Sequence, residues 1–187
     1  MTKYFRFGRS IFAVLLLMSS FSCTIKGKYF FKTIKEDFDD YVINTMYRNV
    51  LNTEDILPDE FVELNARQFI TGKKEAYYSI VLVYRGETPL NILPVASIAI
   101  NIDGELVKLD TAVPDRKFVP KKSFRENRVW EEVSYKVNTD MLKKIAYAKE
   151  IKIKISGEKR NIICKFSKNN FEAFRAFCEK FIIEETN

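Results

Sequence analysis

The spacing of apolar and polar residues predicts a chain built mainly of β-strands. Residues 76–84 are apolar on both faces, which predicts a strand in the interior of a sheet. Residues 151–155 alternate isoleucine with lysine and predict a half-buried strand that pairs with residues 161–166. Residues 61–70 predict another strand. Residues 40–51 fit the spacing of a helix or of a strand, and their strand-forming residues favour the strand.

Turn residues divide this β pattern into shorter units. Asp103-Gly104 stands between the apolar runs 97–102 and 105–109 and predicts a tight hairpin. Residues 111–123 contain two prolines and several basic residues, so they predict a long surface loop. Extended structure returns at residues 124–137.

Two segments toward the C-terminal end have helical spacing. Residues 140–149 follow Asn138 and Thr139, and either residue is suited to cap a helix. A closing helix starts near residues 167–170, where Asn169 followed by Glu172 is a capping-box-like pair. Meandering strands with helices gathered near the C-terminus predict a single α+β domain with a largely antiparallel sheet.

The first residues follow a different pattern. Lys3, Arg6 and Arg9 precede the unbroken apolar run 11–18, and no acidic residue occurs among them. The uncharged stretch, residues 10–25, is shorter than the roughly 20 residues that span a bilayer, and it lacks the amphipathic spacing of a core helix. A positive head followed by an apolar segment predicts an export signal.

Ser22-Cys23 follows this segment directly. This end is similar to the lipobox of bacterial lipoproteins, and the richness in Lys, Ile, Asn and Phe is in keeping with the spirochaetal members, which tolerate looser boxes. Ser20 replaces the usual aliphatic residue, and Phe21 is bulky for its position. The resemblance, which covers residues 1–23 alone, implies removal of residues 1–22 and acylation of Cys23. The alternative is an ordinary secretory signal cut near Ser22 or Ser20, which leaves a free thiol.

The resemblance implies a domain organisation and a location. Residues 23–35 become a lipidated tether, and residues 36–187 become the folded domain. Two or more acyl chains anchor a protein stably, whereas one chain binds only marginally. We therefore expect a protein of the cell envelope that is bound to a bacterial membrane through Cys23, on the periplasmic or the surface side.

The amino-acid composition excludes several kinds of active site and disfavours one class of partner. The chain of 187 residues contains no histidine, which excludes Ser-His-Asp triads, Cys-His dyads and histidine metal sites. The leader carries three basic residues and no acidic one, so its removal lowers the formal net charge from +6 to +3. This small charge does not favour a nucleic-acid partner, which needs a concentrated basic face.

Two cysteines remain in the domain. Strand alternation in residues 161–166 directs Cys164 inward, and helical spacing in residues 171–181 places Cys178 on an apolar stripe. If this helix packs on this strand, the two sulfurs could meet, and an exported protein permits a disulfide. The alternative is a pair of buried thiols that act as small apolar groups.

Carboxylates and other candidate groups do not assemble into a known motif. Adjacent Glu131 and Glu132 lie on a predicted strand and point to opposite faces, so they do not form a paired-carboxylate site by themselves. The acidic clusters at residues 36–40 and 54–60 lack the spacing of a calcium loop. Residues 156–159 have a Ser-x-x-Lys spacing that reads as a hairpin turn. We expect no catalytic residue, no metal ligand and no cofactor.

The basic residues of the chain permit a negatively charged partner but do not identify one. The loop segment 116–122, together with Lys152 and Lys154, fits either a solvated surface or contact with anionic lipid or glycan.

Three functions are compatible with these features. The first is a non-catalytic binding or envelope-assembly module on a membrane, with a protein partner. The second is a carrier of a small apolar ligand inside a curved sheet, suggested by the 16 Phe, 9 Tyr and 1 Trp residues. The third is a hydrolase built on carboxylates from different strands. The sequence favours the first.

Overall fold

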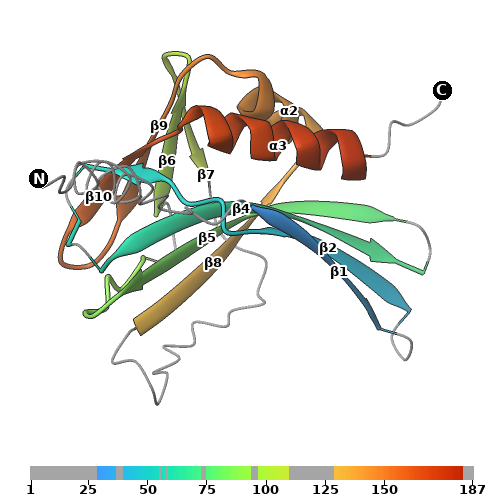
Figure 1. Cartoon of the computed structure of the whole chain (residues 1–187), viewed down its shortest axis with the longest axis horizontal. Helices are drawn as coiled ribbons and strands as arrows, with labels where there is room; N and C mark the ends of the chain where they lie inside the picture. The colour runs from blue at the N-terminus through green and yellow to red at the C-terminus, as the bar shows by residue number, and fades with distance from the viewer. Residues whose placement is uncertain are drawn as a thin grey trace, which may run out of the picture.

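The computed structural model describes residues 29–36, 40–54, 56–57, 59–72, 75–93, 97–109 and 129–182. In these residues, antiparallel strands form two five-stranded sheets, and two helices pack beside them (Figure 1). The predicted α+β class, with antiparallel strand pairing and helices toward the C-terminal end, is confirmed. The division of the strands between two sheets was not predicted. The predicted leader, the lipobox and the loop 111–123 lie outside the described residues.

The chain passes repeatedly from one sheet to the other. Sheet A consists, in spatial order, of β1 (Phe30–Glu36), β2 (Tyr41–Tyr47), β4 (Phe61–Thr71), β5 (Ala76–Gly86) and β8 (Val129–Val137). Sheet B consists of β3 (Asn52–Thr53), β10 (Asn161–Lys165), β9 (Ile151–Ser156), β6 (Ile98–Ile102) and β7 (Glu105–Leu109). The helices are α2 (Thr139–Tyr147) and α3 (Lys168–Phe181).

The predicted strands are present with small changes in length. β5 lies between β4 and β8, in agreement with its apolar residues on both faces. The ambiguous segment 40–51 contains strand β2. The hairpin of β6 and β7 turns at Asp103 (φ 51°) and Gly104 (φ 95°), and this left-handed backbone matches the twist of the flanking strands.

The domain begins earlier than the predicted boundary at residue 36. Residues 30–35, which the prediction assigns to the tether, belong to β1, and β1 pairs with β2 along its whole length. The Phe31 ring also packs against the rings of Phe177 and Phe181 in α3, at centroid distances of 6.3 and 5.4 Å. These contacts make β1 part of the domain.

Side-chain caps begin both helices. Asn138 is the N-cap of α2, and its side chain accepts a hydrogen bond from the N–H of Met141 at 2.9 Å. In α3 the N-cap is Ser167, whose N–H donates to the Asn170 side-chain oxygen at 2.7 Å. The predicted helix start near residues 167–170 is confirmed, but the capping pair is Ser167 with Asn170 and not Asn169 with Glu172.

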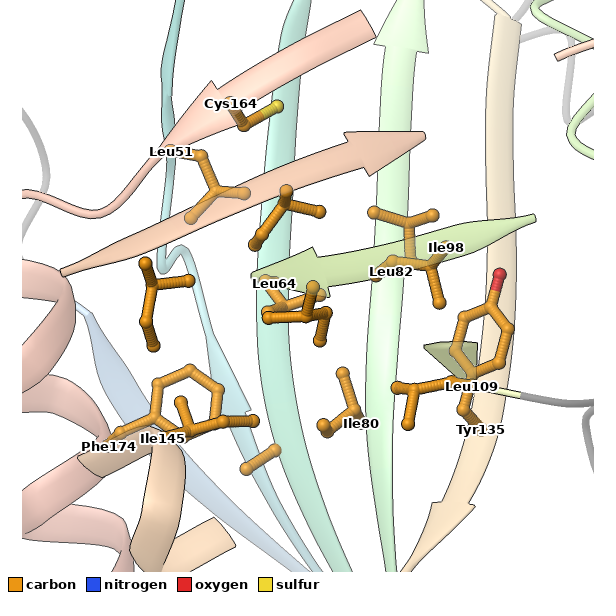
Figure 2. Close-up of a cluster of buried hydrophobic side chains, with 14 of the residues drawn as sticks. Leu51, Leu64, Ile80, Leu82, Ile98, Leu109, Tyr135, Ile145, Cys164 and Phe174 are labelled. Carbon is orange, nitrogen blue, oxygen red and sulfur yellow. The ribbon is translucent and has the colours of Figure 1, made fainter. Parts of the chain in front are cut away.

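The core lies between the inner faces of the two sheets and continues under the helices (Figure 2). Sheet A contributes Leu64, Ile80 and Leu82, and sheet B contributes alternate isoleucines such as Ile98. Phe174 of α3 closes one end, and all of these side chains are fully buried. The apolar face of each sheet thus finds its cover in the other sheet or in a helix.

A row of polar side chains crosses this apolar face and holds the end of α3. Thr33 donates to Asn44 (2.7 Å), and Asn44 donates to the Gln68 side-chain oxygen (2.8 Å). The Gln68 amide then donates to the carbonyl of Phe181 at 2.6 Å, and the Tyr78 hydroxyl donates to the same carbonyl at 3.2 Å. A carbonyl at a helix end has no partner within the helix, so these two donors fix the position of α3 on sheet A.

We expect Tyr78→Phe to lower the free energy of unfolding by about 1 kcal/mol and Gln68→Leu by about 2 kcal/mol, because each change removes a donor from a buried carbonyl. Urea denaturation of the full chain measures the free energy of unfolding of each variant. The control is Tyr77→Phe, which removes a hydroxyl from the neighbouring exposed residue, bonded to Glu75 at the surface. Equal effects of Tyr77→Phe and Tyr78→Phe would contradict the proposed role of the row.

Candidate functional site

Cys23, the predicted lipid-attachment residue, lies outside the described residues. The structure does describe Tyr29, the residue at which the chain enters the domain. Tyr29 lines a pocket of about 680 Å³ together with residues 48–52 and the first turn of α3. We take this pocket and its rim as the candidate functional site.

The pocket exists because β2 leaves sheet A at this point. Arg48 adopts a left-handed backbone (φ 61°), after which residues 49–51 run alongside β4 before the chain enters β3 of sheet B. The N–H of Leu64 donates to the carbonyl of Asn49 at 3.1 Å, which holds this crossing against β4. The gap between the crossing segment and the start of α3 is the pocket.

Two buried asparagines form the pocket floor. Asn170 of α3 donates to the side-chain oxygen of Asn49 at 2.7 Å and to the carbonyl of Val50 at 2.8 Å. Asn49 in turn donates to the carbonyl of Leu64 at 2.6 Å. Both amides are therefore hydrogen-bonded through their nitrogen and their oxygen, and they fasten α3 to the point where the chain changes sheets.

The pocket walls carry groups suited to binding. Arg48, Asn52, Ser167 and Asn169 are polar residues of the lining, which also contains Tyr29, Val50 and Leu51. The carboxylate of Glu172, also in the lining, is 3.9 Å from the Lys168 ammonium. Such a set can accept and donate hydrogen bonds to a polar ligand.

A buried carboxylate at the start of β4 joins three parts of the chain. Glu60 accepts hydrogen bonds from the Tyr84 hydroxyl at 2.7 Å, from the N–H of Leu57 at 3.1 Å, and from the Arg160 guanidinium. Burial by itself would raise the pKa of Glu60, but the hydrogen bonds from Arg160 and Tyr84 outweigh it, so its pKa is lowered. Burial and the neighbouring Glu60 raise the pKa of Tyr84 to about 12. This cluster ties β4 and β5 to the β9–β10 turn.

Glu131 and Glu132 point to opposite faces of β8, as predicted from their spacing. The buried Glu131 carboxylate accepts the N–H groups of three consecutive residues, Leu90, Asn91 and Ile92, at 2.6 to 2.9 Å. Glu132 forms an ion pair with Arg67 at 3.0 Å on the outer face of sheet A. Both carboxylates have structural partners, and Glu131 fixes the backbone of the loop after β5.

The other acidic residues that the structure describes are dispersed. Glu54 forms an ion pair with Lys165 on the surface, and Asp103 accepts N–H groups from Lys149 and Glu150. Among the residues described, no group of three or more acidic or cysteine side chains is placed to hold a metal ion. Asp37, Asp39 and Asp55, which belong to the predicted acidic clusters, lie outside that part of the chain.

Cys164 and Cys178 are both buried and free, so the disulfide that the sequence permits does not form in this structure. Burial raises the pKa of the Cys164 thiol to about 12 and that of Cys178 to about 11. The two thiols pack in the apolar core, which matches the alternative interpretation.

Other predicted features lie at the surface. Lys152 and Lys154 are exposed on the outer face of sheet B, and Lys152 forms an ion pair with Glu150 at 2.8 Å. The predicted partner residues 116–122 lie outside the described residues. Residues 156–159 form the turn after β9, where the carbonyl of Arg160 accepts the N–H of Gly157.

The sequence did not reveal the groups that hold the site together. Asn49, Asn170, Glu60 and Arg160 come from segments far apart in the chain, and each looks like an ordinary surface residue in its local sequence. Asn170 gave one local signal, because it follows Ser167 at the spacing of a helix cap.

Comparison of the chain with protein-family models, with curated proteins and with solved structures gives no match.

Neither of the helices in the described part of the chain has the length and apolar composition that crossing a membrane requires.

We expect Glu60→Gln to lower the free energy of unfolding by about 2 kcal/mol at pH 7, because a charge-assisted contact with Arg160 is lost in a buried position. The folded pKa of Glu60 is below its ordinary value of 4.5. The difference in the free energy of unfolding between the wild type and Glu60→Gln is therefore fully present above pH 4.5. It declines as the pH falls through the folded pKa of Glu60.

Urea denaturation at neutral pH and at about pH 3 measures this difference, which shrinks at the lower pH. The matched control is Glu132→Gln, where the ion pair with Arg67 is solvent-accessible and a change below about 1 kcal/mol is expected. A Glu60→Gln difference that stays constant between the two pH values would contradict the assignment.

Alkylation tests the state of the two cysteines in the folded domain. Iodoacetamide is expected to leave Cys164 and Cys178 unmodified at neutral pH, because both thiols are buried and protonated. Both become labelled in urea without a reductant, as measured by mass spectrometry of tryptic peptides. If labelling in urea requires a reductant, the cysteines form a disulfide and the structural assignment is wrong.

Proposed function

We propose that this protein is a bacterial lipoprotein whose α+β domain is held at a membrane surface by acyl chains on Cys23 and acts by binding rather than catalysis. The observation that carries the proposal is Ser22-Cys23 directly after a positively charged and then apolar leader. The early start of the domain adds to it, since β1 begins at Phe30 and leaves only a short connection to Cys23.

The arrangement of the carboxylates supports binding rather than hydrolysis. Carboxylate catalysis needs two acids facing one substrate. Glu131 and Glu132 point to opposite faces of β8, and Glu131 accepts three backbone N–H groups. Glu60 is bonded to Arg160 and Tyr84. These carboxylates fasten the fold.

The pocket beside Tyr29 supports a binding role. Its lining combines polar residues with Tyr29, Val50 and Leu51, and Asn49 and Asn170 are hydrogen-bonded to each other in it. Such a lining fits a ligand or a partner segment that has both an apolar and a polar part. The space between the two sheets is filled with aliphatic and aromatic side chains, which gives the carrier hypothesis no support.

Lipidation of Cys23 is tested on the protein expressed as its precursor in a bacterial host. We expect the mature chain to lack residues 1–22 by intact-mass measurement, to carry acyl chains on Cys23, and to enter the detergent phase in a phase-separation experiment. The control variant Cys23→Ser is expected to stay in the aqueous phase or to remain uncleaved. A wild-type chain with an unmodified Cys23 in the aqueous phase would refute the proposal in favour of ordinary secretion.

A further inference from the structure

The corner of sheet A where the chain enters the domain exposes a compact apolar group. Phe30 and Val50 are each 44% exposed. The Phe30 ring stacks on Tyr47 with centroids 5.4 Å apart and an interplanar angle of 17°. The Arg48 guanidinium lies over the same Phe30 ring, 5.7 Å from its centroid. We call these four residues the entry corner.

The strand register places the apolar members of the entry corner on one face. Phe31 and Met46 point into the core, so their neighbours Phe30 and Tyr47, which are paired across β1 and β2, point outward. Val50 forms a bridge with Glu63 of β4, whose neighbours Val62 and Leu64 are fully buried in the core. Phe30, Tyr47 and Val50 therefore share the outer face of sheet A.

The connection to Cys23 limits how far the entry corner can lie from a membrane. Residues 23 and 29 are six positions apart, and an extended chain covers at most about 3.5 Å per residue. If Cys23 is acylated, Tyr29 is held within about 20 Å of the bilayer. This step rests on the proposed function.

We propose that the entry corner lies on the lipid surface itself, with Phe30 and Val50 at the boundary between headgroups and acyl chains and with Arg48 among the phosphates. The chemistry supports this partner. Aromatic rings and arginine side chains with an apolar stem are the groups that favour the membrane interface. Here the cation already lies over a ring, so the guanidinium and the ring face the same surroundings.

The contact gives the anchor a second function, because it sets the orientation of the domain. Arg48 and Val50 line the pocket and also belong to the entry corner. A domain that rests on this corner keeps the pocket close to the membrane surface. The partner of the pocket would then be a group that lies at or near the lipid headgroups.

Quenching of tryptophan fluorescence by brominated lipids tests the contact. Trp130 is the single tryptophan of the chain, so the Trp130→Phe variant has no tryptophan fluorescence of its own. In this background, Phe30→Trp and Val50→Trp report on the entry corner. Leu106→Trp is the matched control, because Leu106 is a 60% exposed apolar residue on β7 of sheet B.

The mature acylated variants are reconstituted in vesicles of phosphatidylcholine and phosphatidylglycerol, with or without bromine on the acyl chains. We expect brominated lipid to reduce the fluorescence of Trp at position 30 or 50 at least about twofold, since interfacial side chains reach 5–10 Å into the boundary region. We expect little change at position 106. The two reporters are independent, so misfolding of one variant leaves the other as the test.

The outcomes separate the inference from the proposed function. If the protein floats with vesicles but positions 30 and 50 are quenched no more than position 106, the anchor stands and the membrane contact is wrong. The same conclusion follows if the entry corner is shielded only in native envelopes, which indicates a protein partner. If the acylated preparation cannot be obtained and the chain does not float with vesicles, the proposed function itself fails.

Discussion

Burial of the inner face of sheet A is the constraint on which the rest of the structure depends. A five-stranded sheet with one apolar face must be covered, and here the cover consists of sheet B at one end and α3 with α2 at the other (Figures 1 and 2). Both covers are formed by segments that alternate along the chain with the strands of sheet A. The chain therefore leaves sheet A and returns more than once, and the backbone groups at the crossings that the structure describes need partners.

Buried polar side chains supply those partners. Glu131 binds three consecutive N–H groups of the loop after β5, Asn49 and Asn170 hold the crossing from β2 to β3, and Gln68 holds the end of α3. Each of these groups would be costly to bury alone, and each is hydrogen-bonded. The buried carboxylates and amides that first suggest chemistry are thus explained by the topology of the domain.

The same crossing from β2 to β3 connects the fold with the proposed function. The left-handed turn at Arg48 opens the pocket, and it leaves Val50 and the Phe30–Tyr47 pair exposed where the chain enters the domain. In the proposed function, acyl chains on Cys23, six residues before Tyr29, would bring this corner to the membrane by chain length alone. The proposal thus gives this part of the fold a role in positioning the domain on the lipid.

The sequence by itself determined the local structure. The alternation at residues 151–155, the Asp103-Gly104 turn and a helix cap at Asn138 or Thr139 each depend on neighbours within a few residues. The structure contains all three, with Asn138 as the cap. The leader is an equally local pattern, and it carries the proposed location. Tertiary structure alone decided that the strands divide into two sheets, that residues 30–35 join the domain, and that Glu60 meets Arg160. These outcomes depend on contacts between residues far apart in the chain, such as positions 60 and 160, and no spacing within either segment encodes the identity of its partner.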